Sequence, residues 1–514
     1  MPPPFQTEST YAMPYLELRG IRKTYPGGVL ANDDITLSVE QGEIHGLVGE
    51  NGAGKSTLMK ILYGMEQPDH GEILLAGRSL KIANPHAAIQ LGIGMVHQHF
   101  QLVPNLTVAE NIALGAEPRK GLFADQAAMH SRVRALSERF GLQVDPAARV
   151  SDLSVGLQQR VEILKMLYRD ARLLILDEPS AVLTPQEVES LFSVLRRLVA
   201  EGCTAIFITH KLYEIMSICE RATVLRRGRV VGSVRTAESS PAEISRLMVG
   251  HDVASPQRTP PNANPRDRLV VRALTTGSAH RSTPLDFTIR SGEILGVAGV
   301  EGNGQSELIE ALLGVRTGVT GDIVLDGTSL SRLNARRRRE KGLALIPEDR
   351  NREGLSRPMQ VWENLASATY YRSARASVLD LGGLQGAARD LIRRFDIRVS
   401  SEKSAVSTLS GGNAQKVVIA RELAESPAVL IAAQPTRGLD VGAAQFVHEQ
   451  LLNLRREGVG ILLISADLDE LLALSDRLIV MFEGRILATF QRDAATRQAL
   501  GLAMAGRLES EDAP

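Results

Sequence analysis

Two glycine-rich stretches carry the residues best suited to phosphate chemistry: GENGAGKST at 49–57 and GVEGNGQSE at 299–307. The first fits the pattern G-x-x-x-x-G-K-[ST], whose glycines let backbone N–H groups surround an anion at a helix N-terminus. In this pattern Lys55 reaches the β- and γ-phosphates of a nucleotide, and the Ser56 hydroxyl serves Mg²⁺. The predicted nucleotide contacts are Gly49, Glu50, Asn51, Gly52, Ala53, Gly54, Lys55, Ser56 and Thr57.

An acid pair ends an apolar segment, LLILDEP at 173–179. Asp177 is suited to the Mg²⁺ shell, and Glu178 to orienting or deprotonating an attacking water. Alone, such a pair is common at a solvated turn, but a phosphate-binding loop upstream favours the catalytic interpretation. Together the two motifs predict a nucleotide hydrolase.

The glycine-rich stretches belong to a repeat that spans the chain. Gly49 and Gly299 are 250 residues apart (299 − 49), and the segments LSVGLQQRVEI and LSGGNAQKVVI, which begin at Leu153 and Leu409, are 256 apart (409 − 153). Two short insertions between the loop and the LSxG segment account for the difference. A period this long indicates domain duplication.

Short apolar runs alternate with amphipathic segments in each half, which predicts a largely parallel sheet flanked by helices. The runs at 43–49, 172–178 and 204–210 are predicted strands, and residues near 100–160 form a predicted helical insertion. A Pro-rich stretch, ASPQRTPPNANPRDR, is typical of a linker. The predicted organisation is a loosely held tail (1–14), a first domain (15–250), a linker (251–268), a second domain (269–505) and an acidic tail (506–514).

Composition narrows the class of protein. The chain has 59 basic and 59 acidic residues, and this balance argues against a nucleic-acid partner. Cys203 and Cys219 are the only cysteines, which match no metal-ligand spacing and suggest a reducing compartment. The N-terminus lacks the features of a signal peptide, and no apolar run approaches the ~18 residues that cross a bilayer. A membrane role would therefore need another chain to do the crossing.

The segment LSGGN at 409–413 resembles the signature motif of ABC-type ATPases. In that family Gln98 matches the glutamine that touches Mg²⁺ or the attacking water, His210 the switch histidine on the γ-phosphate, and Tyr25 the aromatic that stacks on adenine. Tyr25 also precedes PGG, so an ordinary turn tyrosine stays open. The resemblance covers about residues 15 to 500. It implies two tandem ABC-type P-loop ATPase domains, each a RecA-like α/β core with an inserted helical subdomain and an antiparallel β subdomain.

The second half departs from this pattern at nearly every catalytic position. Its loop keeps Gly299, Gly302 and Gly304, so the backbone could still bind nucleotide. Without the lysine, the acids and the histidine, it lacks the charge neutralisation that phosphoryl transfer needs. The residues of this degenerate site are Gly299, Gly304, Gln305, Ser306, Glu348, Ala433, Gln434 and Ala466.

The signature motifs show the opposite asymmetry. Ser410, Gly411 and Gly412 are intact in the second half, whereas Val155 and Leu157 alter the motif of the first. ABC domains pair head to tail, so the resemblance implies that the Lys55 loop faces the Ser410 signature. All the departures then fall in one composite ATP site, which leaves one site that hydrolyses ATP.

Several strings resemble the ATP-binding subunits of bacterial simple-sugar and nucleoside importers, among them IPEDRNREGL and AAQPTRGLD. The nucleoside branch is the expected one, with a simple sugar as the alternative. The resemblance implies two integral membrane permease subunits, an extracellular lipoprotein or periplasmic solute-binding protein, and a peripheral place on the cytoplasmic face of the membrane. A soluble translation-associated ATPase is the alternative function; the long charged linker and two intact sites of that class differ from this chain.

A run of arginines, Arg336–Arg339, could bind phosphate or lipid. A solvated helix face is the more usual explanation of such a run, so it is expected to have no function of its own.

Overall fold

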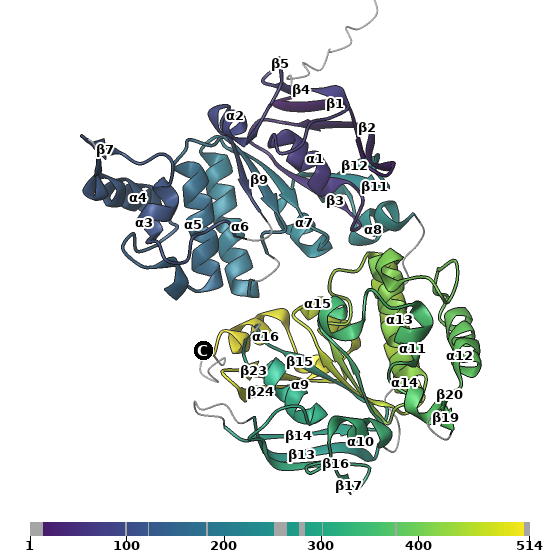
Figure 1. Cartoon of the computed structure of the whole chain (residues 1–514). Coiled ribbons are helices and arrows are strands. Elements are labelled where there is room, and N and C mark those ends of the chain that lie inside the picture. Colours follow the sequence, from purple (N-terminus) through teal and green to yellow (C-terminus); the bar gives the residue numbers. More distant parts are fainter. Residues whose placement is uncertain are drawn as a thin grey trace, which may run out of the picture. The chain divides into compact units, whose positions relative to one another are not determined.

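The computed structural model describes residues 14–97, 100–121, 123–180, 183–250, 265–276, 283–300, 302–375 and 378–507. The chain divides into two compact units, Met1–Val253 and Ala254–Pro514, and each is described by itself (Figure 1). Gln98, most of both predicted tails and the linker up to residue 264 lie outside the described residues.

A six-stranded sheet forms the core of unit 1, in the order β12-β11-β3-β10-β9-β6. All neighbours are parallel except the edge strand β12, and the side chains of β3, β6 and β10 are buried throughout. The carboxyl ends of the parallel strands therefore meet at one edge of the sheet. The strands are β3 (Ile44–Gly49), β6 (Ile93–Val96), β9 (Leu173–Asp177), β10 (Thr204–Ile208), β11 (Arg221–Arg226) and β12 (Arg229–Arg235). The three strands predicted from sequence are confirmed.

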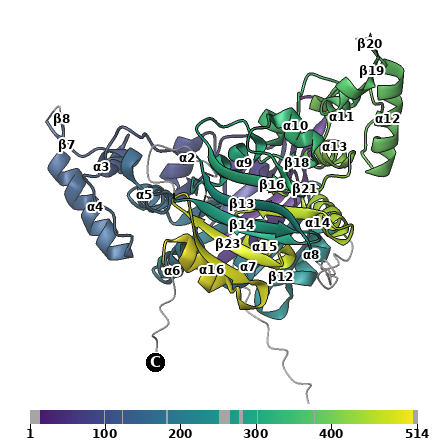
Figure 2. The same cartoon turned by 90° about the horizontal axis from the view of Figure 1, so that it is seen from below.

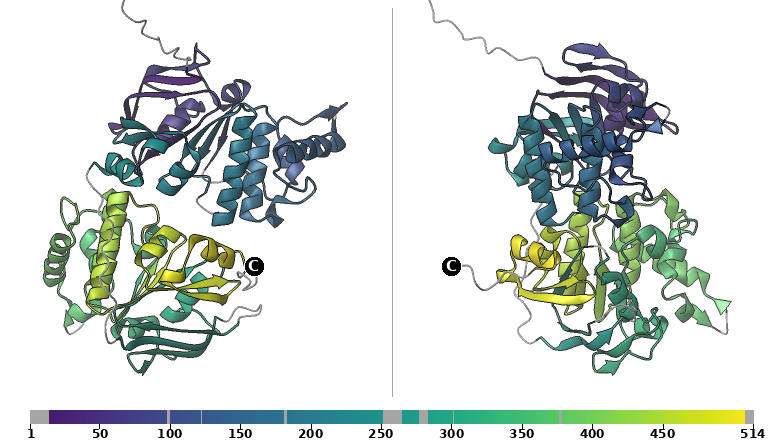
Figure 3. Two further views of the ribbon diagram at one scale, coloured as in Figure 1. Left: turned by 180° about the vertical axis from the view of Figure 1, so that it is seen from behind. Right: turned by 90° about the vertical axis from the view of Figure 1, so that its left-hand side faces the viewer.

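Helices and a second sheet surround this core. The antiparallel sheet has the order β2-β1-β4-β5, and in Figures 1 and 3 it lies at the opposite side of the core from α3 and α4. Its strands are β1 (Leu16–Tyr25), β2 (Val29–Val39), β4 (His70–Leu75) and β5 (Arg78–Leu80). The helices are α1 (Lys55–Leu62), α2 (Pro85–Gln90), α3 (Val108–Ala113), α4 (Gln126–Phe140), α5 (Val155–Leu167), α6 (Pro185–Ala200), α7 (Leu212–Ile218) and α8 (Pro241–Val249).

The helical insertion is confirmed, and local sequence explains where its helices begin. Thr107 and Glu110 form a reciprocal capping box at α3, and outside the insertion Thr184 and Glu187 form another at α6. Asp125 caps α4. A short hairpin, β7 (Arg119–Lys120) and β8 (Phe123–Ala124), joins α3 to α4 and was not predicted.

Unit 2 repeats this architecture, with a core sheet ordered β18-β21-β22-β15-β23-β24 and an antiparallel sheet ordered β14-β13-β16-β17. Its helical part, α11 to α13 with the hairpin β19–β20, projects to one side of the sheet (Figure 2). The strands are β13 (Asp267–Thr275), β14 (Leu285–Arg290), β15 (Ile294–Ala298), β16 (Thr320–Leu325), β17 (Thr328–Ser329), β18 (Leu343–Ile346), β19 (Ala374–Arg375), β20 (Val378–Leu379), β21 (Val429–Ala433), β22 (Gly460–Ile464), β23 (Arg477–Phe482) and β24 (Arg485–Gln491). The helices are α9 (Gln305–Leu313), α10 (Ala335–Glu340), α11 (Val361–Ala366), α12 (Leu381–Arg394), α13 (Gly411–Leu423), α14 (Val441–Arg456), α15 (Leu468–Leu474) and α16 (Arg497–Met504).

The extra residues of unit 2 lie in three places rather than the two that were expected. The offset between equivalent elements is 250 at β6 and β18 (343 − 93), 253 at α3 and α11 (361 − 108), 255 at α4 and α12 (381 − 126) and 256 at α5 and α13 (411 − 155). The first and largest step contains a π-helical turn, Arg350–Gly354.

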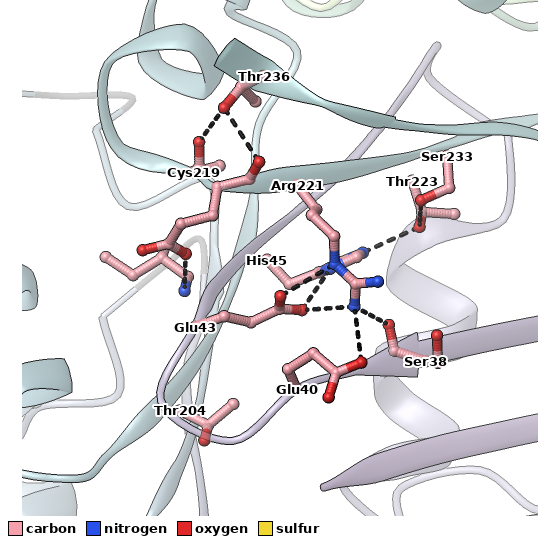
Figure 4. A network of polar contacts seen from close by, with 12 residues as sticks. Ser38, Glu40, Glu43, His45, Thr204, Cys219, Arg221, Thr223, Ser233 and Thr236 are labelled. Carbon is pink, nitrogen blue, oxygen red and sulfur yellow. Dashed lines mark hydrogen bonds and ion pairs between the residues drawn. The ribbon is translucent and has the colours of Figure 1, made fainter. Parts of the chain in front are cut away.

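A buried polar network ties β3 to β11 in unit 1 (Figure 4). Arg221 makes a bidentate ion pair with Glu43, with both N–O distances 3.0 Å, and also donates to the Ser38 carbonyl at 3.1 Å. His45 lies between Glu43 Oε1 at 2.8 Å and Thr223 Oγ1 at 2.9 Å. Burial raises the pKa of Glu43, but hydrogen bonds with His45 and Arg221 outweigh it and lower that pKa to about 2.

The arginine run is only partly the solvated face that was expected. Arg338 is 4% exposed, and its guanidinium donates to the carbonyls of Ala311 and Leu312 at 2.8 and 2.7 Å and of Leu333 at 2.8 Å. It therefore binds carbonyls of the last turn of α9, of which Ala311 also accepts from the Gly314 cap amide at 3.2 Å. Its neighbours Arg336 and Arg337 are exposed.

Candidate active site

The glycine-rich loop of unit 1 joins β3 to the first turn of α1, as predicted. Lys55 begins α1 and is buried, and its Nζ donates to the carbonyls of Gly49 at 2.6 Å and Glu50 at 3.0 Å. Gly54 has a φ of 103°, and a Cβ there would lie 2.4 Å from the Ala31 carbonyl oxygen. The conformation at Gly54 therefore requires glycine. The Lys55 side chain lies against the carbonyls of the loop.

The acid pair and the histidine meet at the carboxyl ends of β9 and β10. Asp177 is the last residue of β9, and Glu178 follows it with a φ of 47°. Glu178 Oε1 lies 2.9 Å from Nδ1 of His210, and the Glu178 amide donates to the Ile208 carbonyl at 2.9 Å. Residues more than thirty positions apart in sequence are therefore in direct contact.

The charges of this group perturb one another. Burial lowers the pKa of Lys55, against the attraction of Glu178 and Asp177. Burial and the neighbouring Glu178 carboxylate raise the pKa of Asp177, whereas Lys55 and a hydrogen bond with Ser56 lower it. The hydrogen bond with His210 lowers the pKa of Glu178 despite partial burial. Adjacent carboxylates of this kind are stabilised when a cation neutralises them.

These side chains fit a nucleotide with Mg²⁺. The cation prefers oxygen ligands, and the Ser56 hydroxyl, which lowers the pKa of Asp177, and the Asp177 carboxylate both supply oxygen. Among the described residues no group of three or more His, Cys, Asp and Glu side chains could hold a metal on its own. Such a cluster is not required here, since Mg²⁺ in nucleotide sites keeps water and phosphate ligands.

The structure does not assign a role to the two other predicted residues, Gln98 and Tyr25. Gln98 lies outside the described residues. Tyr25 ends β1 and accepts a hydrogen bond from the Gly28 amide at 3.1 Å, so it is part of a turn. The Lys23 ammonium lies 5.7 Å from the Tyr25 ring centroid. This geometry is compatible with both interpretations of Tyr25 offered from sequence.

Unit 2 keeps the backbone of this site and changes its side chains. Gln305 begins α9 after Gly304, whose φ of 101° matches that of Gly54, and Gln305 Nε2 donates to the Val300 carbonyl at 3.1 Å. Gln434 has a φ of 45°, and its Oε1 accepts from the Ala466 amide at 3.1 Å. Ala433 is buried at the end of β21, where unit 1 has Asp177. Amide contacts thus replace the charged contacts of unit 1.

The structure also places Glu348 and the two signature segments. Glu348, at the position equivalent to Gln98, makes an ion pair with Arg437. Ser410 caps α13, and Gly411 and Gly412 are the first residues of this helix. In unit 1, Ser154 caps α5 in the same way, with Val155 as its first residue. Both signature segments therefore present a helix N-terminus.

The sequence interpretation missed two buried residues beside the site. Asn32 Nδ2 donates to the Gly54 carbonyl at 3.1 Å and so supports the loop from β2. Glu214, on α7, accepts hydrogen bonds from hydroxyls on both sides of the Glu178–His210 contact. Neither belongs to the glycine, acid or signature motifs, so spacing gave no signal for them.

Comparison with known proteins agrees with this geometry. The family model described as "ABC transporter" matches residues 32–181 and 282–437. The chain is 46% identical over 501 residues to the guanosine import ATP-binding protein of Bacillus subtilis, covering 96% of this chain and 98% of that protein. It is 44% identical to the glucose import ATP-binding protein of Haloferax volcanii, covering 96% of both. It is also 44% identical to the nucleoside import ATP-binding protein of Lactococcus lactis, covering 93% and 96%.

These matches extend over both units, and the relatives named are all import ATP-binding proteins. They give no support to a translation-associated ATPase. The chain belongs to the ABC transporter family, as an import-type ATP-binding protein with two ABC ATPase domains.

Proposed function

We propose that unit 1 hydrolyses ATP and that the group of Lys55, Ser56, Asp177, Glu178 and His210 carries the reaction. The single observation that supports this most is the contact between Glu178 and His210 beside Asp177 and the Lys55 loop. Lys55 turns from the Gly49 and Glu50 carbonyls to the phosphates, and the loop amides hold their oxygens. Glu178 takes the proton of the attacking water as the bond between the γ-phosphorus and its bridging oxygen breaks, and ADP leaves.

Ser56, Asp177 and Gln98 are the proposed Mg²⁺ residues, and the ion would neutralise charge on the phosphates. His210 is proposed to contact the γ-phosphate while its Nδ1 stays beside Glu178. Tyr25 is proposed to stack on adenine. Together with Lys55 and Glu178, these residues form the proposed catalytic site.

The altered side chains of unit 2 support a site that does not hydrolyse ATP. Gln305, Ala433, Gln434 and Ala466 supply neither a cation nor a carboxylate, so they add no charge for phosphate or metal and no general base. The intact signature of unit 2 then has a function only if it serves the ATP of unit 1. We therefore propose that Ser410, Gly411 and Gly412 complete the Lys55 site, as the asymmetry of the motifs in the sequence indicates.

The import relatives indicate that ATP hydrolysis is coupled to permease chains in the membrane. No helix in the described parts of the chain has the length and hydropathy to cross a membrane. We propose that the chain acts peripherally at the cytoplasmic face with two permease subunits. A lipoprotein or periplasmic solute-binding protein would deliver the solute to them. ATP favours the closed state of the domains, and hydrolysis reopens them, so the coupling is a population shift.

The proposed solute is a nucleoside. Two of the three relatives above are named for guanosine or nucleoside import, and the third for glucose import, at nearly equal identity. The solute does not need to touch this chain, so these names support the proposal only by relationship. Uptake of labelled guanosine by vesicles that contain the whole transporter, competed with glucose and ribose, decides it. Sugar transport without guanosine transport would reject the nucleoside.

One further experiment tests the class of partner. The purified chain should co-purify with polytopic membrane chains and hydrolyse ATP only when Mg²⁺ is present. Ribosome sedimentation without any membrane partner would contradict the importer assignment.

A further inference from the structure

A buried carboxylate lies beneath the Glu178–His210 contact in unit 1. Glu214, on α7, is 2% exposed, and each of its oxygens accepts one hydroxyl. Ser180 Oγ donates to Glu214 Oε1 at 2.5 Å, and Thr209 Oγ1 donates to Glu214 Oε2 at 2.8 Å. Both hydroxyl-bearing residues are themselves 2% exposed. The three side chains form a fully paired hydrogen-bond network in a region from which water is largely excluded.

The two hydroxyls come from the two loops that carry the proposed catalytic pair. Ser180 follows Glu178 by two residues, and Thr209 directly precedes His210. Lys211 adds a third connection, because its Nζ donates to the Ser180 carbonyl at 3.3 Å and lies 3.5 Å from Glu214 Oε1. The loop after β9 and the loop after β10 are thus fixed to one another through a side chain that belongs to neither.

The equivalent carboxylate in unit 2 makes only half of this arrangement. Glu470 Oε1 accepts from Thr436 Oγ1 at 2.8 Å and lies 2.9 Å from His448 Nε2. Its Oε2 is buried and has no hydrogen-bond partner in the described part of the chain. Ser465, which replaces Thr209, accepts from the Asp467 amide at 3.0 Å, as Thr209 does from the Lys211 amide, but it donates no hydrogen bond to Glu470 among the contacts described. The link to the second loop is therefore present in unit 1 and absent in unit 2.

We propose that Glu214 is a positioning residue for ATP hydrolysis, which holds Glu178 and His210 in register through Ser180 and Thr209. This rests on the proposed function, in which Glu178 activates water and His210 contacts the γ-phosphate. A hydrogen bond from a hydroxyl to a carboxylate is short and directional. It therefore limits the movement of the loop that carries the hydroxyl. Unit 2 has lost both the acid and the histidine, so its second loop needs no such link.

The substitution Thr209→Val tests the link, because it removes the hydroxyl that donates to Glu214 and keeps the shape of the side chain. It also removes the acceptor of the Lys211 amide, and Ser465→Ala removes the equivalent acceptor in unit 2. The turnover of the full-length chain should fall by about 10- to 100-fold, which is the usual effect of removing a residue that holds a reacting side chain in place. The affinity of this variant for ATP, measured by equilibrium binding, should change by less than about threefold. Thr209 supports Glu178 and His210 and not the glycine-rich loop that binds the phosphates. Thr209→Ser, which restores a hydroxyl, should recover most of the turnover.

Two variants complete the design. Ser180→Ala removes the other hydroxyl and should reduce turnover to a similar extent; it keeps the test decisive if Thr209→Val fails to fold. Ser465→Ala in unit 2 is the matched control and should leave turnover unchanged, because Ser465 makes no hydrogen bond to Glu470 among the contacts described.

Glu178→Gln, measured beside them, separates this inference from the proposed function. Loss of turnover in Glu178→Gln with normal turnover in both Thr209→Val and Ser180→Ala would overturn the positioning role alone. Equal losses in Thr209→Val and Thr209→Ser, or an equal loss of ATP affinity, would also overturn it. Normal turnover in Glu178→Gln would reject the proposed catalytic role itself.

Discussion

The carboxyl ends of β9 and β10 in unit 1 and of β21 and β22 in unit 2 have the same backbone and different side chains. Glu178 and Gln434 both adopt a positive φ, at 47° and 45°, and both donate their amides to the last residue of the neighbouring strand. Only Glu178 has a histidine beside it. A strained backbone at a functional site is often taken as part of the mechanism. Here the strain survives without the catalytic side chains, so it belongs to the fold.

The largest expected effect comes from giving unit 1 the loop chemistry of unit 2. Lys55→Gln can keep one loop contact, as Gln305 does with the Val300 carbonyl. It removes the cation that faces the phosphates, so we expect turnover to fall by about 10³-fold or more. The reverse change, Gln305→Lys, should add no hydrolysis because Ala433 and Gln434 remain. Steady-state phosphate release measures both, with circular dichroism to confirm folding.

A second comparison tests which signature serves the active loop. Ser410 and Ser154 cap equivalent helices, and their hydroxyls accept from the third helical amide at 3.5 and 3.4 Å. Replacing either with Arg removes one cap, at a similar cost of about 1 kcal/mol. Under the proposed pairing, Ser410→Arg should slow turnover by ~10²–10³ and Ser154→Arg only a few-fold. The opposite ranking would show that each loop uses the signature of its own domain.

The histidine should have a smaller effect with a distinct pH signature. His210→Ala introduces the residue that unit 2 has at Ala466, and turnover should fall by about 10- to 100-fold. The hydrogen bond with His210 lowers the pKa of Glu178, so its loss should raise that pKa. Since Glu178 acts when ionised, the acid limb of the pH–rate profile should move to higher pH in the variant. An unmoved limb would mean that this profile does not report Glu178.

The smallest expected effect is on the stability of unit 1 and not on ATP turnover. Glu43→Gln removes a buried ion-pair partner of Arg221, and the unfolding free energy of unit 1 should fall by roughly 1–3 kcal/mol at pH 7. The folded pKa of Glu43 is about 2, below the usual value of about 4.3, so its stabilisation is present above about pH 5. It is lost as the pH falls toward 2. The difference in Tm between wild type and variant should therefore shrink on acidification.

Two features of the chain provide controls for that measurement. The single tryptophan, Trp362, lies in α11 of unit 2, so its fluorescence follows that unit, while calorimetry follows both. Glu293→Gln is the equivalent substitution in unit 2, where Glu293 pairs with Arg477 at 3.1 Å. A Glu43→Gln variant with a pH-independent deficit would contradict the assigned pKa.

Much of the fold followed from the sequence because its signals are local. Continuous apolar runs located the core strands, and the glycine pattern located the loop at the start of α1. The contacts around Glu214 could not be predicted, since they depend on how α7 packs beneath two strand ends. The burial of Arg338 was missed for a similar reason. A run of charged residues does not show that one guanidinium donates to the carbonyls at the end of another helix.

Our main expectation is that hydrolysis depends on the strand ends of unit 1 and not on those of unit 2. Its most direct test is the steady-state ATP turnover of Glu178→Gln beside that of Gln434→Ala, with ATP binding measured for both. Glu178→Gln should bind ATP and lose about 10²–10⁴ of its turnover, the range expected when a general base is removed. Gln434→Ala should stay within about twofold of the wild type, because among the described contacts the Gln434 side chain bonds only the Ala466 amide. Equal losses in the two variants, or full turnover in Glu178→Gln, would contradict the account.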